Sequence, residues 1–144
     1  MPASLLIHWG RVILGALFSE IVVIAILGVV IVTHRYFIAP GRSAAEYDAF
    51  AHRAGYNVAP AAAALAVFFS ALWATRNLTS SFVANGTLVG IIAVVLTLGF
   101  LFTAKPGERF MYGVLFGLRI IGGYLGGVVA QQIFTGRLSF SLLT

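Results

Sequence analysis

The chain contains no cysteine and little charge of either sign. Nine Lys or Arg and four Asp or Glu make up 9% of its 144 residues, against about a quarter in a typical soluble domain. Apolar residues make up 60%, and the mean hydropathy is +1.02. Because so few charged side chains cannot solvate a whole protein surface, this composition excludes an ordinary soluble domain.

The absences also limit the chemistry. Without cysteine there is no disulfide framework, no thiolate metal site and no cysteine nucleophile. The three histidines, His8, His34 and His52, lie outside the apolar runs and lack the spacing of metal ligands. No Ser-His or paired-Asp arrangement falls within those runs. We therefore expect no catalytic residues, no metal and no cofactor.

Four apolar runs cover residues 12–33, 58–75, 82–104 and 110–134. A helix that spans a bilayer needs roughly 20 apolar residues, so these runs account for most of the chain. In hydrocarbon the backbone must satisfy its own hydrogen bonds, and runs of this length do so as helices. The sequence predicts an all-α integral membrane protein, a four-transmembrane-helix bundle in one membrane domain over residues 1–144.

The longest connection lies between the first two runs and has its own helical pattern. Ser43 and Glu46 have the spacing of a capping box, in which serine and glutamate satisfy each other's backbone donors. Gly55 is a suitable C-terminal stop. The pattern predicts a short interfacial amphipathic helix over residues 44–54, with an apolar stripe at helical spacing made of Tyr47, Phe50, Ala51 and Ala54.

Two ionisable side chains, Glu20 and Arg119, fall inside the apolar runs. A charge at the centre of a membrane helix costs about 2.5–3.5 kcal/mol on insertion scales, so each needs a compensating role. Counting 1.5 Å per residue from opposite membrane faces puts the two at depths that differ by about 4–5 Å. The sequence therefore predicts an intramembrane ion pair if the first and fourth helices touch.

Two interpretations of this pair remain open. In one, Glu20 and Arg119 neutralise each other in a dry contact and fix how the helices pack. In the other, Glu20 is a coupling carboxylate that binds a cation or proton from a hydrated cavity, and Arg119 tunes it or holds an anionic group. The presence or absence of a cavity at Glu20 distinguishes the two.

Residues 14–20 (LGALFSE) resemble the first helix of the small multidrug-resistance transporters, four-helix proteins with an essential membrane-embedded glutamate preceded by small residues. The resemblance implies a coupling role for Glu20 and covers one helix. Those transporters are shorter, and they carry an aromatic signature around the third helix, including a tryptophan, that residues 82–104 lack. We do not infer membership of that family.

The last apolar run contains glycines at repeated spacings of four. Glycine suits positions where two helix backbones approach closely. At 100° per residue the glycines fall on two faces, so one face can pack in the bundle and the other against a second protomer or a partner subunit. Packing of both faces within one chain also remains open. The residues of this candidate helix-packing interface are Gly113, Gly117, Gly122, Gly123, Gly126 and Gly127.

Basic residues at the ends of the runs predict the orientation. They are scattered singly, which is typical of side chains beside lipid headgroups and not of nucleic-acid binding. More of them flank the first and third loops than the termini, so the positive-inside rule places those loops in the cytoplasm and both termini outside. The loop side carries Arg35, Arg42, Arg53, Lys105 and Arg109, and the terminal side carries Arg11, Arg76 and Arg137.

These features predict a small, non-enzymatic, multi-pass protein of a cell membrane, which we take to be a bacterial inner membrane. We expect it to act by helix-mediated assembly, as a homo-oligomer or as an accessory subunit of a membrane complex. The alternative is a small proton- or ion-coupled transporter or channel centred on Glu20. The expected partners are the lipid bilayer and a second copy or another membrane protein.

Overall fold

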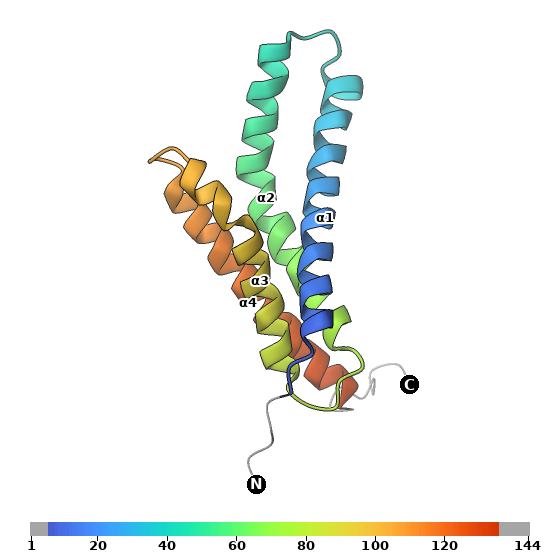
Figure 1. Cartoon of the computed structure of the whole chain (residues 1–144). Coiled ribbons are helices and arrows are strands. Elements are labelled where there is room, and N and C mark those ends of the chain that lie inside the picture. Colours follow the sequence, from blue (N-terminus) through green and yellow to red (C-terminus); the bar gives the residue numbers. More distant parts are fainter. Residues whose placement is uncertain (1–5, 136–144) are drawn as a thin grey trace.

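The computed structural model describes residues 6–135, which form long helices joined by short connections and contain no strand in that range (Figure 1). α1 runs over Trp9–Thr33 and continues into a π-helical turn, η1, over His34–Ile38. The other helices are α2 (Ala44–Thr75), α3 (Phe82–Thr103) and α4 (Arg109–Phe134).

All four helices are long and apolar enough to cross a membrane. The continuous helix Trp9–Ile38 has 30 residues, and α2, α3 and α4 have 32, 22 and 26. At 1.5 Å per residue each is at least about 33 Å long, which exceeds a hydrocarbon core of about 30 Å. For residues 6–135, the prediction of an all-helical fold with four helices long and apolar enough to span a membrane is confirmed.

The structure differs from the prediction of a separate short helix over 44–54, because those residues are the first turns of α2. The capping box begins the helix as expected: the Ser43 hydroxyl accepts a hydrogen bond from the Glu46 amide, and the Ser43 amide donates to the Glu46 carboxylate at 3.0 Å. Gly55 does not end the helix, and Pro60 lies inside it. Pro60 cannot donate a hydrogen bond to the Tyr56 carbonyl, and its ring crowds that carbonyl, yet the helix continues on both sides of it.

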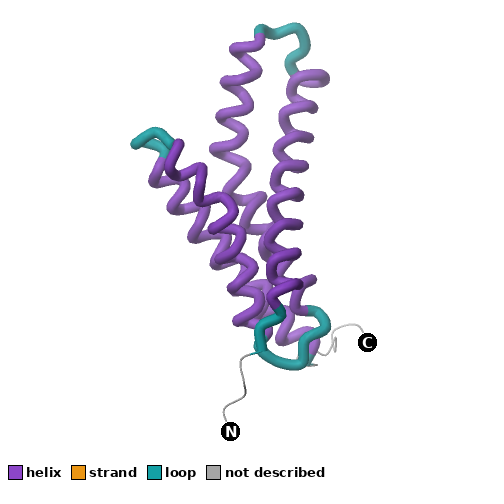
Figure 2. The backbone as a smooth tube through the Cα atoms, viewed as in Figure 1, coloured by secondary structure: helices purple, strands orange, loops and turns teal. Residues whose placement is uncertain are grey.

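The helices form two hairpins, α1–α2 and α3–α4, which lie close together near the termini and diverge toward their loops (Figure 1). Figure 2 shows the α1–α2 and α3–α4 connections at one end of the molecule and the α2–α3 connection at the other, with the α1–α2 hairpin extending farther. α4 packs most extensively on α3 and α2, and α1 packs on α2 and α3. Because α1 has no comparable backbone contact with α4, side chains must link these two helices.

Small side chains fill the core and let the helices approach closely. One cluster joins α1, α2 and α3 through buried valines and alanines, among them Val12, Ala16, Val67 and Ala93. A second cluster, Val23 with Ala63 and Ala66, continues the α1–α2 contact toward the loops. Packing of small residues is the usual source of helix association in lipid, where apolar burial gives no driving force.

Candidate functional site

The structure brings Glu20 and Arg119 together, from α1 and α4. Two parallel contacts join them: Arg119 Nη1 lies 2.5 Å from Glu20 Oε1, and Nη2 lies 3.0 Å from Oε2. This is the bidentate geometry in which a guanidinium and a carboxylate match best. The Arg119 side chain is 3% exposed and that of Glu20 is 17% exposed, so the cation is the more enclosed partner.

Arg119 also binds α3. Its Nη1 donates to the Ala93 carbonyl at 2.8 Å and to the Thr97 hydroxyl at 2.8 Å. The Thr97 hydroxyl in turn donates to the Ala93 carbonyl at 2.9 Å. Within residues 6–135, every side-chain hydrogen bond that joins two of the helices α1, α2, α3 and α4 involves Arg119. One side chain therefore ties α4 to both α1 and α3. The π-helical turn η1 is joined to α2 separately, by the Tyr47 hydroxyl, which donates to the Arg35 carbonyl at 3.4 Å.

A glycine on α3 makes room for this arrangement. A Cβ added to Gly90 would lie 2.5 Å from the Arg119 carbonyl oxygen, closer than real Cβ contacts allow. Gly90 thus permits the backbone approach that brings Ala93, one turn farther along α3, within reach of the guanidinium. The Nε atom of Arg119 is buried and has no hydrogen-bond partner. The guanidinium is held by its two terminal nitrogens.

Four of the six glycines on α4 lie inside the chain's own bundle. A Cβ on Gly122 or Gly126 would lie 2.6 or 2.5 Å from carbonyl oxygens of α2. A Cβ on Gly123 or Gly127 would lie 2.5 or 2.8 Å from carbonyl oxygens of α3. These four positions are filled by α2 and α3, so they are not open to a second protomer.

The other two glycines, Gly113 and Gly117, have nothing within 4 Å of a Cβ position. They belong to an apolar arc of about 100° on α4 that we call the outer face. Phe110, at one end of it, is 79% exposed. The outer face consists of Phe110, Gly113, Gly117, Ile120, Ile121 and Tyr124.

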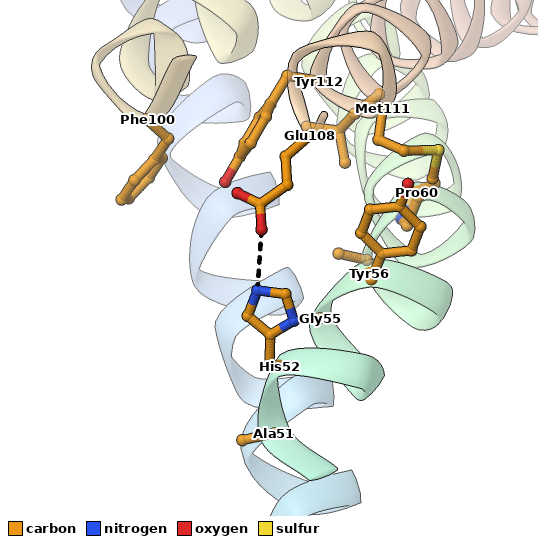
Figure 3. A pocket seen from close by; sticks show the side chains of 11 residues that line it. Ala51, His52, Gly55, Tyr56, Pro60, Phe100, Glu108, Met111 and Tyr112 are labelled. Carbon is orange, nitrogen blue, oxygen red and sulfur yellow. Dashed lines mark ion pairs between the residues drawn. The ribbon is translucent and has the colours of Figure 1, made fainter. Parts of the chain in front are cut away.

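A cavity that the sequence did not indicate lies between the hairpins. It has a volume of about 330 Å³ and is lined by the N-terminal half of α2 and by the neighbouring ends of α3 and α4. Figure 3 shows His52 of α2 and Glu108, the residue before α4, pointing toward each other at 3.2 Å between Nε2 and Oε1. These residues are 56 positions apart, and no local pattern links them.

A second cavity, of about 620 Å³, lies between the loop-side ends of α1 and α2. It is lined in part by His34, Arg42 and Arg53. Neither cavity is lined by Glu20 or Arg119. Within residues 6–135, no three His, Asp or Glu side chains come together as a metal site would require.

Asn85, a polar residue of the third apolar run that suits a local link between helices, is a buried side chain of α3 that binds the segment before α1. Its Oδ1 accepts from the His8 amide at 2.8 Å, and its Nδ2 donates to the Leu6 carbonyl at 3.0 Å. The segment before α1 is therefore fixed to the start of α3. The signal for this role was only a single polar residue at the edge of an apolar run.

No family model matches this chain, and neither a curated protein nor a solved structure shows significant similarity to it.

Proposed function

We propose that the chain is a non-enzymatic multi-pass protein of a bacterial inner membrane that acts by helix-mediated assembly. The assembly we favour is a homo-oligomer formed through the outer face of α4. An accessory subunit of a membrane complex would use the same face against a different helix. The observation that carries the proposal is the pair Gly113 and Gly117: nothing in the chain lies within 4 Å of a Cβ built at either position, and large apolar side chains beside them are exposed.

A glycine pair with this spacing lets two membrane helices approach closely. A second copy offers the same pair, so a two-fold contact of α4 with α4 is complementary to itself and closes without leaving a free end. Large exposed side chains beside the glycines, such as Phe110 and Ile121, supply the surrounding packing surface. The glycines that would compete for this role, including Gly123 and Gly127, are occupied by α3.

The geometry of the ion pair favours a structural role. Glu20 lies eleven residues from Trp9, or about 16 Å along α1, and Arg119 lies ten residues from Arg109, or about 15 Å along α4. Because the two helices run in opposite directions, these lengths together match a hydrocarbon core of about 30 Å and put the pair near its middle. A bidentate pair there neutralises both charges, as a dry packing contact requires.

Disulfide cross-linking tests the assembly, and the absence of native cysteine removes background. We expect Gly117→Cys in native membranes to give a product of twice the chain mass on mild oxidation. Ile24→Cys, on the exposed side of α1, is the matched control and should stay monomeric. Gly113→Leu with Gly117→Leu should reduce the oligomer to monomer in detergent. If Gly117→Cys forms no cross-link and the double leucine variant keeps the parental size, the proposed interface is wrong.

The second candidate function is a proton- or ion-coupled transporter centred on Glu20. One observation favours it: the Glu20 side chain is 17% exposed, so its carboxylate is more accessible than the guanidinium it binds. The test is Glu20→Gln in reconstituted vesicles. Transport is supported if this variant keeps its assembly but loses a proton-linked flux that the parent protein shows. Absence of any such flux in the parent argues against it.

A further inference from the structure

The cavity between the hairpins has an apolar body and a polar end. Its walls include Ala59 and Pro60 of α2, Phe100 of α3, and Met111 and Leu115 of α4. The ion pair of His52 with Glu108 lies at the polar end, and Tyr112 lies beside Glu108 (Figure 3). Few polar groups in a mainly apolar cleft of a few hundred Å³ are typical of a small-ligand site.

The cavity runs parallel to the helices. On α4 it extends from Leu115, four residues from Arg119 and about 6 Å away along the axis, to Glu108, about 16 Å away. On α2 it extends from Pro60 to Ala51, about 14 Å. With the ion pair of Arg119 near the middle of the bilayer, the apolar end lies in the hydrocarbon and the polar end at the headgroups.

The lining decides what kind of molecule suits this cavity. Apolar side chains cover most of its length, and the polar groups of His52, Glu108 and Tyr112 lie together at one end. The occupant must therefore be apolar along most of its length and polar at the end near His52 and Glu108.

We infer that this cavity binds one phospholipid with a primary-amine zwitterionic headgroup, of the phosphatidylethanolamine class. One acyl chain lies along Pro60, Met111 and Leu115. The headgroup ammonium donates hydrogen bonds to the Glu108 carboxylate, and its phosphate accepts from His52 or the Tyr112 hydroxyl. A quaternary ammonium has no N–H to donate, and an anionic headgroup without an amine would face the Glu108 carboxylate unfavourably.

The inference rests on the membrane placement in the proposed function but not on self-assembly. Tyr112 and Leu115 lie on a different side of α4 from Gly113 and Gly117. At 100° per residue, each of the two is rotated about the helix axis by 100° or more from both glycines. Lipid binding and cross-linking through Gly117→Cys can therefore fail separately.

Native mass spectrometry of the full chain tests the inference. The protein is extracted from vesicles that contain equal amounts of palmitoyl-oleoyl phosphatidylethanolamine, phosphatidylcholine and phosphatidylglycerol. We expect one retained phosphatidylethanolamine, at least tenfold above the other two lipids. Leu115→Trp fills the cavity and should lower this retention at least tenfold, whereas Ile24→Trp, on the exposed side of α1, should leave it unchanged.

Glu108→Gln keeps the size of the side chain and removes its charge, so it tests the headgroup without filling the cavity. We expect it to abolish the preference for phosphatidylethanolamine over phosphatidylcholine. Equal retention of the three lipids, a preference for phosphatidylglycerol, or unchanged retention in Leu115→Trp would overturn the inference. Cross-linking of Gly117→Cys in the Leu115→Trp background should match the parent, which separates loss of lipid from loss of assembly.

Discussion

Arg119 is the residue on which the contact between distant helices depends. α1 and α4 share little backbone surface, yet the guanidinium of Arg119 reaches Glu20 on one side and Thr97 on the other. An arginine suits this position because its planar fork can bind a carboxylate with two nitrogens and still donate to other acceptors. The pair thus neutralises two charges and also specifies which helices meet at this depth.

Thr97→Val tests the α3 side of this network. The substitution keeps the shape of the side chain and removes the hydroxyl that accepts from Arg119. We expect a loss of about 1 kcal/mol in the free energy of unfolding, in the range measured for hydrogen bonds between membrane helices. Thr97→Ser retains the hydroxyl and is the control. Equal stability of the valine variant and the parent in a detergent unfolding titration would show that this bond contributes nothing.

The two charged members of the site could be predicted from the sequence, and Thr97 could be predicted as a link between helices, but not that it binds Arg119. Glu20 and Arg119 stand out because each interrupts an apolar run, and helix geometry places them at similar depths. The Ala93 carbonyl carries no sequence signal, since every residue has one. The partner of Thr97 could not be predicted because a threonine hydroxyl in a helix can also bond to its own backbone, and that of Thr97 does so as well.

At the scale of helices, α4 depends on glycines that place its backbone directly against α2 and α3. Gly126 faces Phe68 of α2, and Gly123 faces Gly86 of α3. The two glycine faces were evident from the 100° rotation per residue. The sequence did not show what packs on these faces, because glycines at this spacing occur both in contacts within one chain and in contacts between chains.

Gly123→Ala distinguishes these two uses. Its Cβ would lie 2.5 Å from the Gly86 carbonyl oxygen, and backbone cannot move aside as a flexible side chain can. We expect the alanine variant to lose about 1–3 kcal/mol in the free energy of unfolding, as overpacked cores do. Gly99→Ala, where nothing lies within 4 Å, is the control and should be neutral or up to about 1 kcal/mol more stable.

A change in oligomer size with unchanged monomer stability in Gly123→Ala would place this glycine between protomers instead. Two measurements on separate portions of the same preparation distinguish these outcomes. Thermal unfolding reports the stability of the monomer, and size-exclusion chromatography of the folded protein reports the oligomer size.

The start of α2 could be predicted from the sequence, whereas its length could not. Ser43 and Glu46 form the expected capping box, since that motif depends only on local spacing. Gly55 suggests a stop and Pro60 suits the first turn of a second helix, but neither forces a break. A helix tolerates glycine at about 1 kcal/mol, and an internal proline removes one hydrogen bond that the packing of the other turns can offset.

The main feature of the whole molecule is that the α1–α2 and α3–α4 hairpins diverge from each other toward their loops. They meet near the start of α1 and the end of α4, where small residues allow close packing, and they diverge toward the loops (Figure 1). The cavity lined by His52 and Glu108 lies between the diverging ends. Four apolar spans were evident from run length alone. The divergence was not, because it depends on contacts between residues far apart in the sequence.

Cysteine labelling tests which side of the membrane the loops of the two hairpins face. Ala39→Cys and Gly107→Cys probe the two loops, and Asn77→Cys probes the connection near the termini. We expect an impermeant maleimide to label only the Asn77 variant in intact cells and all three after lysis, because the positive-inside rule puts the loops in the cytoplasm. Arg137, which contributes to the opposite count of basic residues, lies outside the described residues.

Labelling of both loop cysteines in intact cells would reverse the orientation. Labelling of only one of the two would contradict the four-span arrangement itself.

The most direct test of the account is a double-mutant cycle on the pair that joins the hairpins, measured as free energy of unfolding in lipid bicelles. Arg119→Met or Glu20→Met alone leaves one charge unpaired, and each should cost about 3–5 kcal/mol. The double variant removes both charges and should recover most of that loss, which gives a coupling of at least about 2 kcal/mol. If the two single losses simply add in the double variant, Glu20 and Arg119 do not act as a pair and the account is wrong.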